Sequence, residues 1–167
     1  MQNLLRIASQ LNLHDRSPTE LLCQYAAILQ ELQSRGISRT SNNPVADYAE
    51  WLVSQKLDLK LKGNSSAGYD AEGPDSARYE IKSRRATSKS ISYQLSAIRN
   101  LEAHHFDFVI AVLFELDFTV SLAFKIPDAV VLEKSTFQPH TNSHVFRLKR
   151  SLLEDERVEE ITAIFNR

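Results

Sequence analysis

A turn flanked by two short segments constrains the fold of this chain more than any other stretch. Residues 68–85 read Gly-Tyr-Asp-Ala-Glu-Gly-Pro-Asp-Ser-Ala-Arg-Tyr-Glu-Ile-Lys-Ser-Arg-Arg, with a turn signal at 73–76. Proline fixes one backbone angle, and aspartate and serine side chains can hydrogen-bond the amides of a turn. The stretch therefore predicts a β-hairpin whose turn centres near residues 74 and 75.

Side chains on the second strand of this hairpin should alternate between the two faces of the sheet. Glu80 and Lys82 then share one face with Arg78 and Arg84, while residues 79, 81 and 83 face the other way. A regular ladder places Asp70 opposite Glu80. Two carboxylates and a lysine converge on one side of the hairpin, which is unfavourable unless a ligand binds there.

The chemistry of these side chains favours a hard cation. Paired carboxylates offer the oxygen ligands that Mg²⁺ prefers, with Mn²⁺ as the alternative ion. A lysine beside such an ion can orient or help to deprotonate a water, or balance charge in a transition state.

Asp70 followed by Glu80-Ile81-Lys82 resembles the Asp…(Asp/Glu)-x-Lys signature of the restriction-endonuclease-like nucleases, the PD-(D/E)xK superfamily. The literal Pro74-Asp75 pair is an alternative for the first half of the motif. We prefer Asp70, because Asp75 lies in the predicted turn and cannot face Glu80 across the ladder. The resemblance covers about residues 43 to 131.

The resemblance implies a Mg²⁺-dependent DNA endonuclease that hydrolyses phosphodiester bonds, in a restriction or DNA-repair system. Asp70 and Glu80 would hold the metal, helped by the backbone carbonyl of Ile81. Lys82 would position the attacking water. The metal would stabilise charge on the scissile phosphate and on the leaving oxygen.

A helix is predicted to start at Asn43-Pro44 and to run to about Lys56. In the nucleases that the chain resembles, a glutamate on the helix before the hairpin often points into the metal site. Glu50 matches that place and would support a second ion or a metal-bound water. Asp47 is the rival for this role.

The charge of the chain is uneven, although its net charge is only −1. Residues 78–99 hold six Arg or Lys and one acid, whereas residues 152–165 hold five acids and one Arg. A basic region around paired carboxylates indicates an anionic polymer such as DNA. The candidate DNA contacts are Arg78, Arg84, Arg85, Lys89, Gln94 and Arg99.

The N-terminal part is predicted to be helical and to carry no chemistry. Residues 2–12 fit a short helix, and Ser17-Pro18-Thr19-Glu20 is a helix start with a capping box. The second helix ends at Gly36. Its apolar face either braces the core, which we favour, or forms the interface of a homodimer.

The remaining elements follow from hydrophobic periodicity. In chain order we expect a helix over 91–104, a strand buried on both faces over 106–116, a tight turn near 116–117, a strand over 118–126, a short helix from 127 to 132, a loop over 135–142, an edge strand over 144–148 and a helix over 151–166.

Together these elements predict a single α/β domain over 1–167, a restriction-endonuclease-like mixed β-sheet flanked by α-helices on both faces. It would comprise a helical extension (1–36), a nuclease core (43–131) and a C-terminal strand and helix (144–167). A single cysteine, Cys23, and a start without a signal-peptide pattern favour a cytoplasmic protein. The longest apolar run, Phe108 to Phe114, is too short to span a membrane.

Two other classes of function remain open. The first is a domain of the same fold that binds DNA or a protein partner without cutting. The second is a scaffold in which Glu80 and Lys82 form a surface ion pair without a function.

Overall fold

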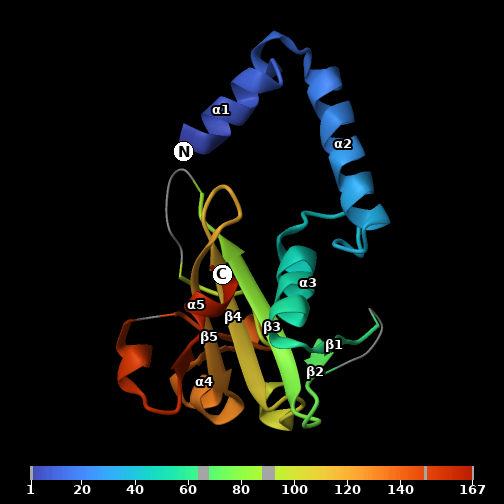
Figure 1. Ribbon diagram of the computed structural model, residues 1–167. Coiled ribbons are helices and arrows are strands. Elements are labelled where there is room, and N and C mark those ends of the chain that lie inside the picture. The colour runs from blue at the N-terminus through green and yellow to red at the C-terminus, as the bar shows by residue number, and fades with distance from the viewer. Residues whose placement is uncertain (1, 64–67, 88–92, 149, 167) are drawn as a thin grey trace.

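The computed structural model describes residues 2–63, 68–87, 93–148 and 150–166 (Figure 1). Over these residues the chain is a mixed α/β structure around a six-stranded sheet of order β1-β2-β3-β4-β5-β8, in which only the β3/β4 pair is parallel. The strands of this sheet are β1 (Lys60–Leu61), β2 (Ala71–Glu72), β3 (Arg78–Arg85), β4 (Phe108–Phe114), β5 (Val120–Pro127) and β8 (Glu159–Glu160).

Strand β4 lies at the centre of the sheet and contributes side chains to two hydrophobic layers, one on each face. Ile110 and Val112 point into the layer beneath α3 (Val45–Leu57) and α5 (Thr162–Phe165). Val109 and Ala111 point into the other layer, which includes α4 (Asp128–Lys134) and parts of segments 93–106 and 143–152. All four side chains are fully buried. The prediction of a strand covered on both faces is confirmed, and helices do cover both faces of the sheet.

The predicted hairpin forms with the expected register. Ala71 pairs with Tyr79 and Glu72 with Arg78, which is the predicted register, and the regular pairing ends at Ala71, next to Asp70. The turn closes through the Gly73 amide, which donates to the Ala77 carbonyl over 2.9 Å. A second predicted hairpin is also present, because β5 pairs antiparallel with β4 across a turn in which the Glu115 amide donates to Thr119.

The helix predicted over 91–104 is wrong for its described part, which begins at residue 93. The Leu95 and Ile98 amides donate to the carbonyls of Phe146 and His144, so this segment is extended and pairs with a distant one. Asn100 then adopts a left-handed conformation (φ 51°) and leads into a single 3₁₀ turn, η2 (Leu101–Ala103). The apolar residues that suggested a helix are buried, but against the sheet rather than as a helical stripe.

The C-terminal half differs from the prediction in two more places. Instead of a helix over 151–166, the chain forms a 3₁₀ helix, η4 (Arg150–Glu154), then a turn, β8 and the short α5. Asp155 ends η4, because its carboxylate accepts hydrogen bonds from the Arg157 backbone and guanidinium. The predicted loop over 135–142 contains β6 (Thr136–Gln138) and η3 (Pro139–Thr141), and β6 pairs with β7 (Ser143–Val145).

The N-terminal helices are α1 (Gln2–Gln10) and α2 (Pro18–Ser34), joined by η1 (Leu13–Asp15). The capping box of α2 is confirmed: the Glu20 amide donates to the Ser17 hydroxyl, and the Ser17 amide donates to the Glu20 carboxylate. The favoured role of this region is wrong, however, because α2 buries none of its residues and stands away from the sheet (Figure 1). No helix in the described ranges has the length and hydropathy needed to cross a membrane.

Candidate functional site

The site begins at Asp70, the residue just before β2. The Asp70 amide donates to the Tyr79 carbonyl over 2.9 Å, next to the last regular pair of the hairpin, Ala71 and Tyr79. The Ile81 amide donates to the Asp70 carboxylate over 2.7 Å, in place of a backbone carbonyl. The side chain of Asp70 is therefore held against β3 beside Glu80, whereas the rival Asp75 lies exposed in the turn and accepts the Ala77 amide.

Glu80 and Lys82 lie on the same face of β3, as alternation predicts. The Lys82 ammonium donates to the Glu80 carboxylate over 2.5 Å, and the two side chains are only 17% and 16% exposed. A pair this shielded from water is more strongly coupled than an exposed surface pair. The arrangement does not match the scaffold interpretation, which requires a solvated pair.

Burial raises the pKa of the Glu80 carboxyl above its ordinary value. The neighbouring Asp70 carboxylate raises this pKa further, both by like charge and by a hydrogen bond that favours the protonated form. Lys82 opposes the shift without cancelling it. A buried carboxyl beside a second carboxylate is stabilised by added positive charge.

The backbone of Ile81 supplies a further oxygen at the same edge. In a β-ladder the amide and carbonyl of one residue point to the same side of the strand. Because the Ile81 amide points toward Asp70, the Ile81 carbonyl is directed toward that edge as well. Asp70, Glu80 and the Ile81 carbonyl are the oxygen donors that could hold a cation here.

A polar cavity of about 400 Å³ opens in front of Glu80 and Lys82. The crossover between β3 and β4 forms its opposite wall with Arg99, Asn100 and His105. A further part of the lining is Gly68, Ala97 and Phe106. The cavity thus places three groups that can donate hydrogen bonds across from Glu80 and Lys82.

Gly68 fits closely against this wall. Its φ of +113° is a conformation that side-chain-bearing residues rarely adopt, and a Cβ here would lie 3.1 Å from the His105 Cβ. The glycine lets the chain leading to Asp70 approach His105. Asn100 and His105 were not among the predicted site residues, because the helical pattern assigned to 91–104 gave no reason to bring them to β3.

Glu50, the predicted fourth acid, is engaged elsewhere. It lies on α3, which covers the face of the sheet opposite to Glu80, and forms an ion pair with Arg39. The Arg39 guanidinium also donates to the Lys62 carbonyl over 2.7 Å. Among the residues that the structure describes, no three His, Cys, Asp or Glu side chains form a group that could hold a metal.

Asp47, the alternative to Glu50, has a structural role, because its carboxylate is hydrogen-bonded to the loop before α3. Its carboxylate accepts hydrogen bonds from the hydroxyls of Ser38 and Thr40 and from the amides of Arg39 and Thr40. Burial alone would raise the pKa of Asp47, but these donors outweigh burial and hold it below its ordinary value. Asp47 therefore fixes the loop before α3.

The predicted DNA contacts do not form one surface. Arg99 lines the cavity and Arg84 is exposed on the same face of β3 as Glu80. Arg78 pairs with Asp107 over 3.0 Å, and Arg85 points to the other face, where it donates to the Leu116 carbonyl.

The last two predicted DNA contacts are Gln94 and Lys89. Gln94 accepts a hydrogen bond from Arg147 over 3.0 Å, and Lys89 lies outside the described residues.

Comparison of the chain with protein-family models and with curated proteins finds no match. The interpretation of the site therefore depends on its geometry and on the motif described above.

Proposed function

We propose that this protein is a Mg²⁺-dependent nuclease that hydrolyses phosphodiester bonds of DNA. The observation that carries the proposal is the cluster of Asp70, Glu80 and Lys82, of which Glu80 and Lys82 line a polar cavity. Two carboxyl groups in contact, with a lysine on the same strand face, are the elements of the PD-(D/E)xK signature. The contact of the Asp70 carboxyl with Glu80, and the exposed position of Asp75 in the turn, support the choice of Asp70 over Asp75.

The donor set suits Mg²⁺, with Mn²⁺ as an alternative. Mg²⁺ is usually bound by one or two carboxylates and substrate phosphates and keeps several waters, so a third protein carboxylate is not required. Asp70, Glu80 and the Ile81 carbonyl would hold the ion, and the raised pKa of Glu80 indicates a site that favours added positive charge. The ion would supply Lewis-acid stabilisation of charge on the phosphate.

The side chains around the cavity would have the remaining roles in hydrolysis. Lys82 would orient the water that attacks phosphorus, and would release Glu80 when a cation takes over its carboxylate. Arg99, Asn100 and His105 would contact the phosphate from the opposite wall, because a cationic or amide donor suits an anionic oxygen. Water adds to phosphorus and the bond to the leaving oxygen breaks.

The strand order is compatible with a restriction-endonuclease-like fold. A hairpin (β2/β3) carries the acidic cluster, a crossover follows, and β4 returns parallel to β3. In that fold the helix before the hairpin packs on the sheet, as α3 does here. We infer the same fold for this chain.

A binding domain that does not cut is the second candidate. Two observations favour it. The Glu80 carboxylate is already paired with the Lys82 ammonium, and Glu50 is paired with Arg39 and does not join Asp70 and Glu80 as a third acidic ligand. Such a domain would use the cavity and the nearby cations for DNA without hydrolysis.

A cleavage assay separates the two candidates. Supercoiled plasmid is incubated with the protein and Mg²⁺ or Mn²⁺, with chelator as the first control and Glu80→Gln as the second. The nuclease proposal expects metal-dependent nicking that Glu80→Gln abolishes. Metal-independent nicking, or equal nicking by Glu80→Gln, would point to a contaminating enzyme and reject the assignment.

A further inference from the structure

An extended apolar surface lies on the N-terminal arm, which we define as residues 2–34 and which comprises α1, η1 and α2. Eight large apolar side chains on this arm are between 38% and 67% exposed. They are Leu4, Leu5, Ile7, Leu11, Leu21, Leu22, Tyr25 and Ile28. None of the described residues of α1 or α2 is buried.

Several of the exposed residues on each helix follow helical spacing. On α2, Leu21, Tyr25 and Ile28 recur at i, i+4 and i+7, which places them on one side of the helix. On α1, Leu4 and Ile7 recur at i and i+3. Figure 1 shows α1 and most of α2 away from the sheet, and the eight side chains remain 38% to 67% exposed.

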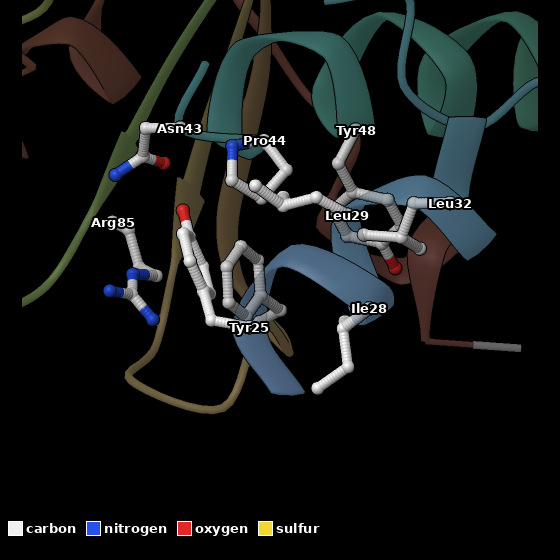
Figure 2. A pocket seen from close by; sticks show the side chains of 9 residues that line it. Tyr25, Ile28, Leu29, Leu32, Asn43, Pro44, Tyr48 and Arg85 are labelled. Carbon is white, nitrogen blue, oxygen red and sulfur yellow. The ribbon is translucent and has the colours of Figure 1, made fainter. Parts of the chain in front are cut away.

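An apolar groove continues this surface toward the body of the protein. It has a volume of about 360 Å³ and lies between α2 and the start of α3. Figure 2 shows Tyr25, Ile28 and Leu32 of α2 on one side and Pro44 and Tyr48 on the other. The groove and the arm form one contiguous apolar region, because Tyr25 and Ile28 belong to both.

The area of the arm matches what a stable interface needs. At roughly 180 Å² for a whole residue of this size, the eight exposed fractions correspond to on the order of 700 Å² per chain. A standard interface buries about 800 Å² per partner.

The charges of the arm exclude strongly anionic partners. Residues 2–35 hold three Arg and three acids, and Arg16–Glu20 and Arg35–Glu31 pair within the helix or at its end. A near-neutral arm without a basic face does not suit DNA phosphates or an anionic membrane. Two copies of the same arm can meet without net repulsion between like charges.

From these observations we infer that two copies of this chain associate through their N-terminal arms to form a homodimer. The interface is isologous: the same faces of α1 and α2 contribute from each copy, and the groove beside Tyr25 and Ile28 is covered at its edge. The inference does not depend on the proposed nuclease activity.

Sedimentation equilibrium of the full chain over a range of concentrations tests the dimer. The wild type is expected to have a mass near twice 19.0 kDa. Leu22→Glu with Ile28→Glu should weaken association by roughly ten-fold or more, since each charge would be buried against an apolar face. Leu153→Glu changes an equally apolar residue that is 44% exposed outside the arm, and should leave the mass unchanged.

A second readout guards against misfolding of the double variant. Far-UV circular dichroism should be the same for all three proteins, because both substituted arm residues are exposed. A spin label on Cys23, the only cysteine, should show a dipolar coupling between copies in the wild type and none in the double variant. A wild type that is monomeric at all concentrations, or a double variant that dimerises equally well, would overturn the inference.

Discussion

The carboxylate of Asp70 accepts the backbone amide of Ile81 over 2.7 Å, and this hydrogen bond seats Asp70 beside Glu80. The bond replaces one that a strand residue would normally make through its carbonyl. The hairpin therefore gives up regular pairing at the residue that brings its two acids together. The same contact makes the structural and the metal-binding roles of Asp70 separable by mutation.

Asp70→Asn and Asp70→Ala should separate these roles. Asparagine keeps an oxygen that can accept the Ile81 amide but lacks the charge, so it should keep the fold and lose Mg²⁺ binding. Alanine leaves a partly buried amide unpaired and should in addition lower the free energy of unfolding by about 1–3 kcal/mol. Isothermal titration calorimetry and urea denaturation measure the two effects. Metal binding by Asp70→Asn at wild-type affinity would remove Asp70 from the site.

The pKa of Glu80 should depend on Asp70. Burial and the adjacent carboxylate both raise it, so removing the carboxylate by Asp70→Asn should lower it. Carboxyl NMR titration of Glu80 in the two proteins gives the comparison. Since a raised pKa in the folded state favours the protonated form, the stability due to Glu80 in metal-free protein is present at low pH and is lost as pH rises through that pKa.

The same shift predicts how metal binding responds to pH. Mg²⁺ and the proton compete for the Glu80 carboxylate, so affinity should fall as pH drops, and should begin to fall at a higher pH than for an ordinary glutamate. Calorimetry at a series of pH values from acidic to neutral measures this dependence. An affinity independent of pH would contradict the assignment of Glu80 as a ligand.

Much of the hairpin was predictable from the sequence, because its determinants are local. The Gly73–Ser76 turn sets the register, and the register sets which residues of β3 face Asp70. The same alternation places Arg85 on the face opposite to Glu80. Its position among other basic residues in the sequence nevertheless led to its prediction as a DNA contact.

The crossover could not be predicted in the same way. Leu95, Ile98 and Leu101 have a spacing that fits a helix, but residues 93–98 pair with 144–148, about fifty positions further along the chain. Local periodicity carries no information about such pairing. Asn100 and His105 reach the cavity only because of it. The partner of Glu50, Arg39, is likewise set by the packing of a loop and not by any local pattern.

Asp47→Ala should destabilise the protein without affecting metal binding. Its carboxylate accepts four hydrogen bonds from the loop over 38–40, and hydrogen bonds to a charged group contribute about 1.5–3 kcal/mol. Its pKa is lowered in the folded state, so its contribution is present near neutral pH and is lost as pH falls through the folded pKa. Thermal unfolding at pH 7 and pH 3 measures both effects. Asp75→Ala, which removes one exposed turn contact, is the matched control and should change stability by less than about 1 kcal/mol.

Arg99→Ala should weaken DNA binding and reduce its salt dependence. If Arg99 contacts one phosphate, the slope of log affinity against log salt should fall by roughly 0.9. Arg85→Ala removes the same charge on the opposite face of the sheet and should leave the slope unchanged. Fluorescence anisotropy at several salt concentrations compares the three proteins. A larger effect of Arg85→Ala would place the DNA on the face covered by α3.

Lys82→Ala tests the catalytic claim most directly, measured as plasmid cleavage and DNA binding in parallel. The ammonium lies 2.5 Å from Glu80 and can reach a water bound at that carboxylate. We expect the variant to bind DNA within a few-fold of the wild type and to lose cleavage by roughly 10²- to 10⁴-fold, the usual contribution of a positioned acid–base group. A wild-type protein that binds linear, supercoiled or branched DNA but cuts none of them with Mg²⁺ or Mn²⁺ would contradict the nuclease proposal, as would a Lys82→Ala variant that cuts at the wild-type rate.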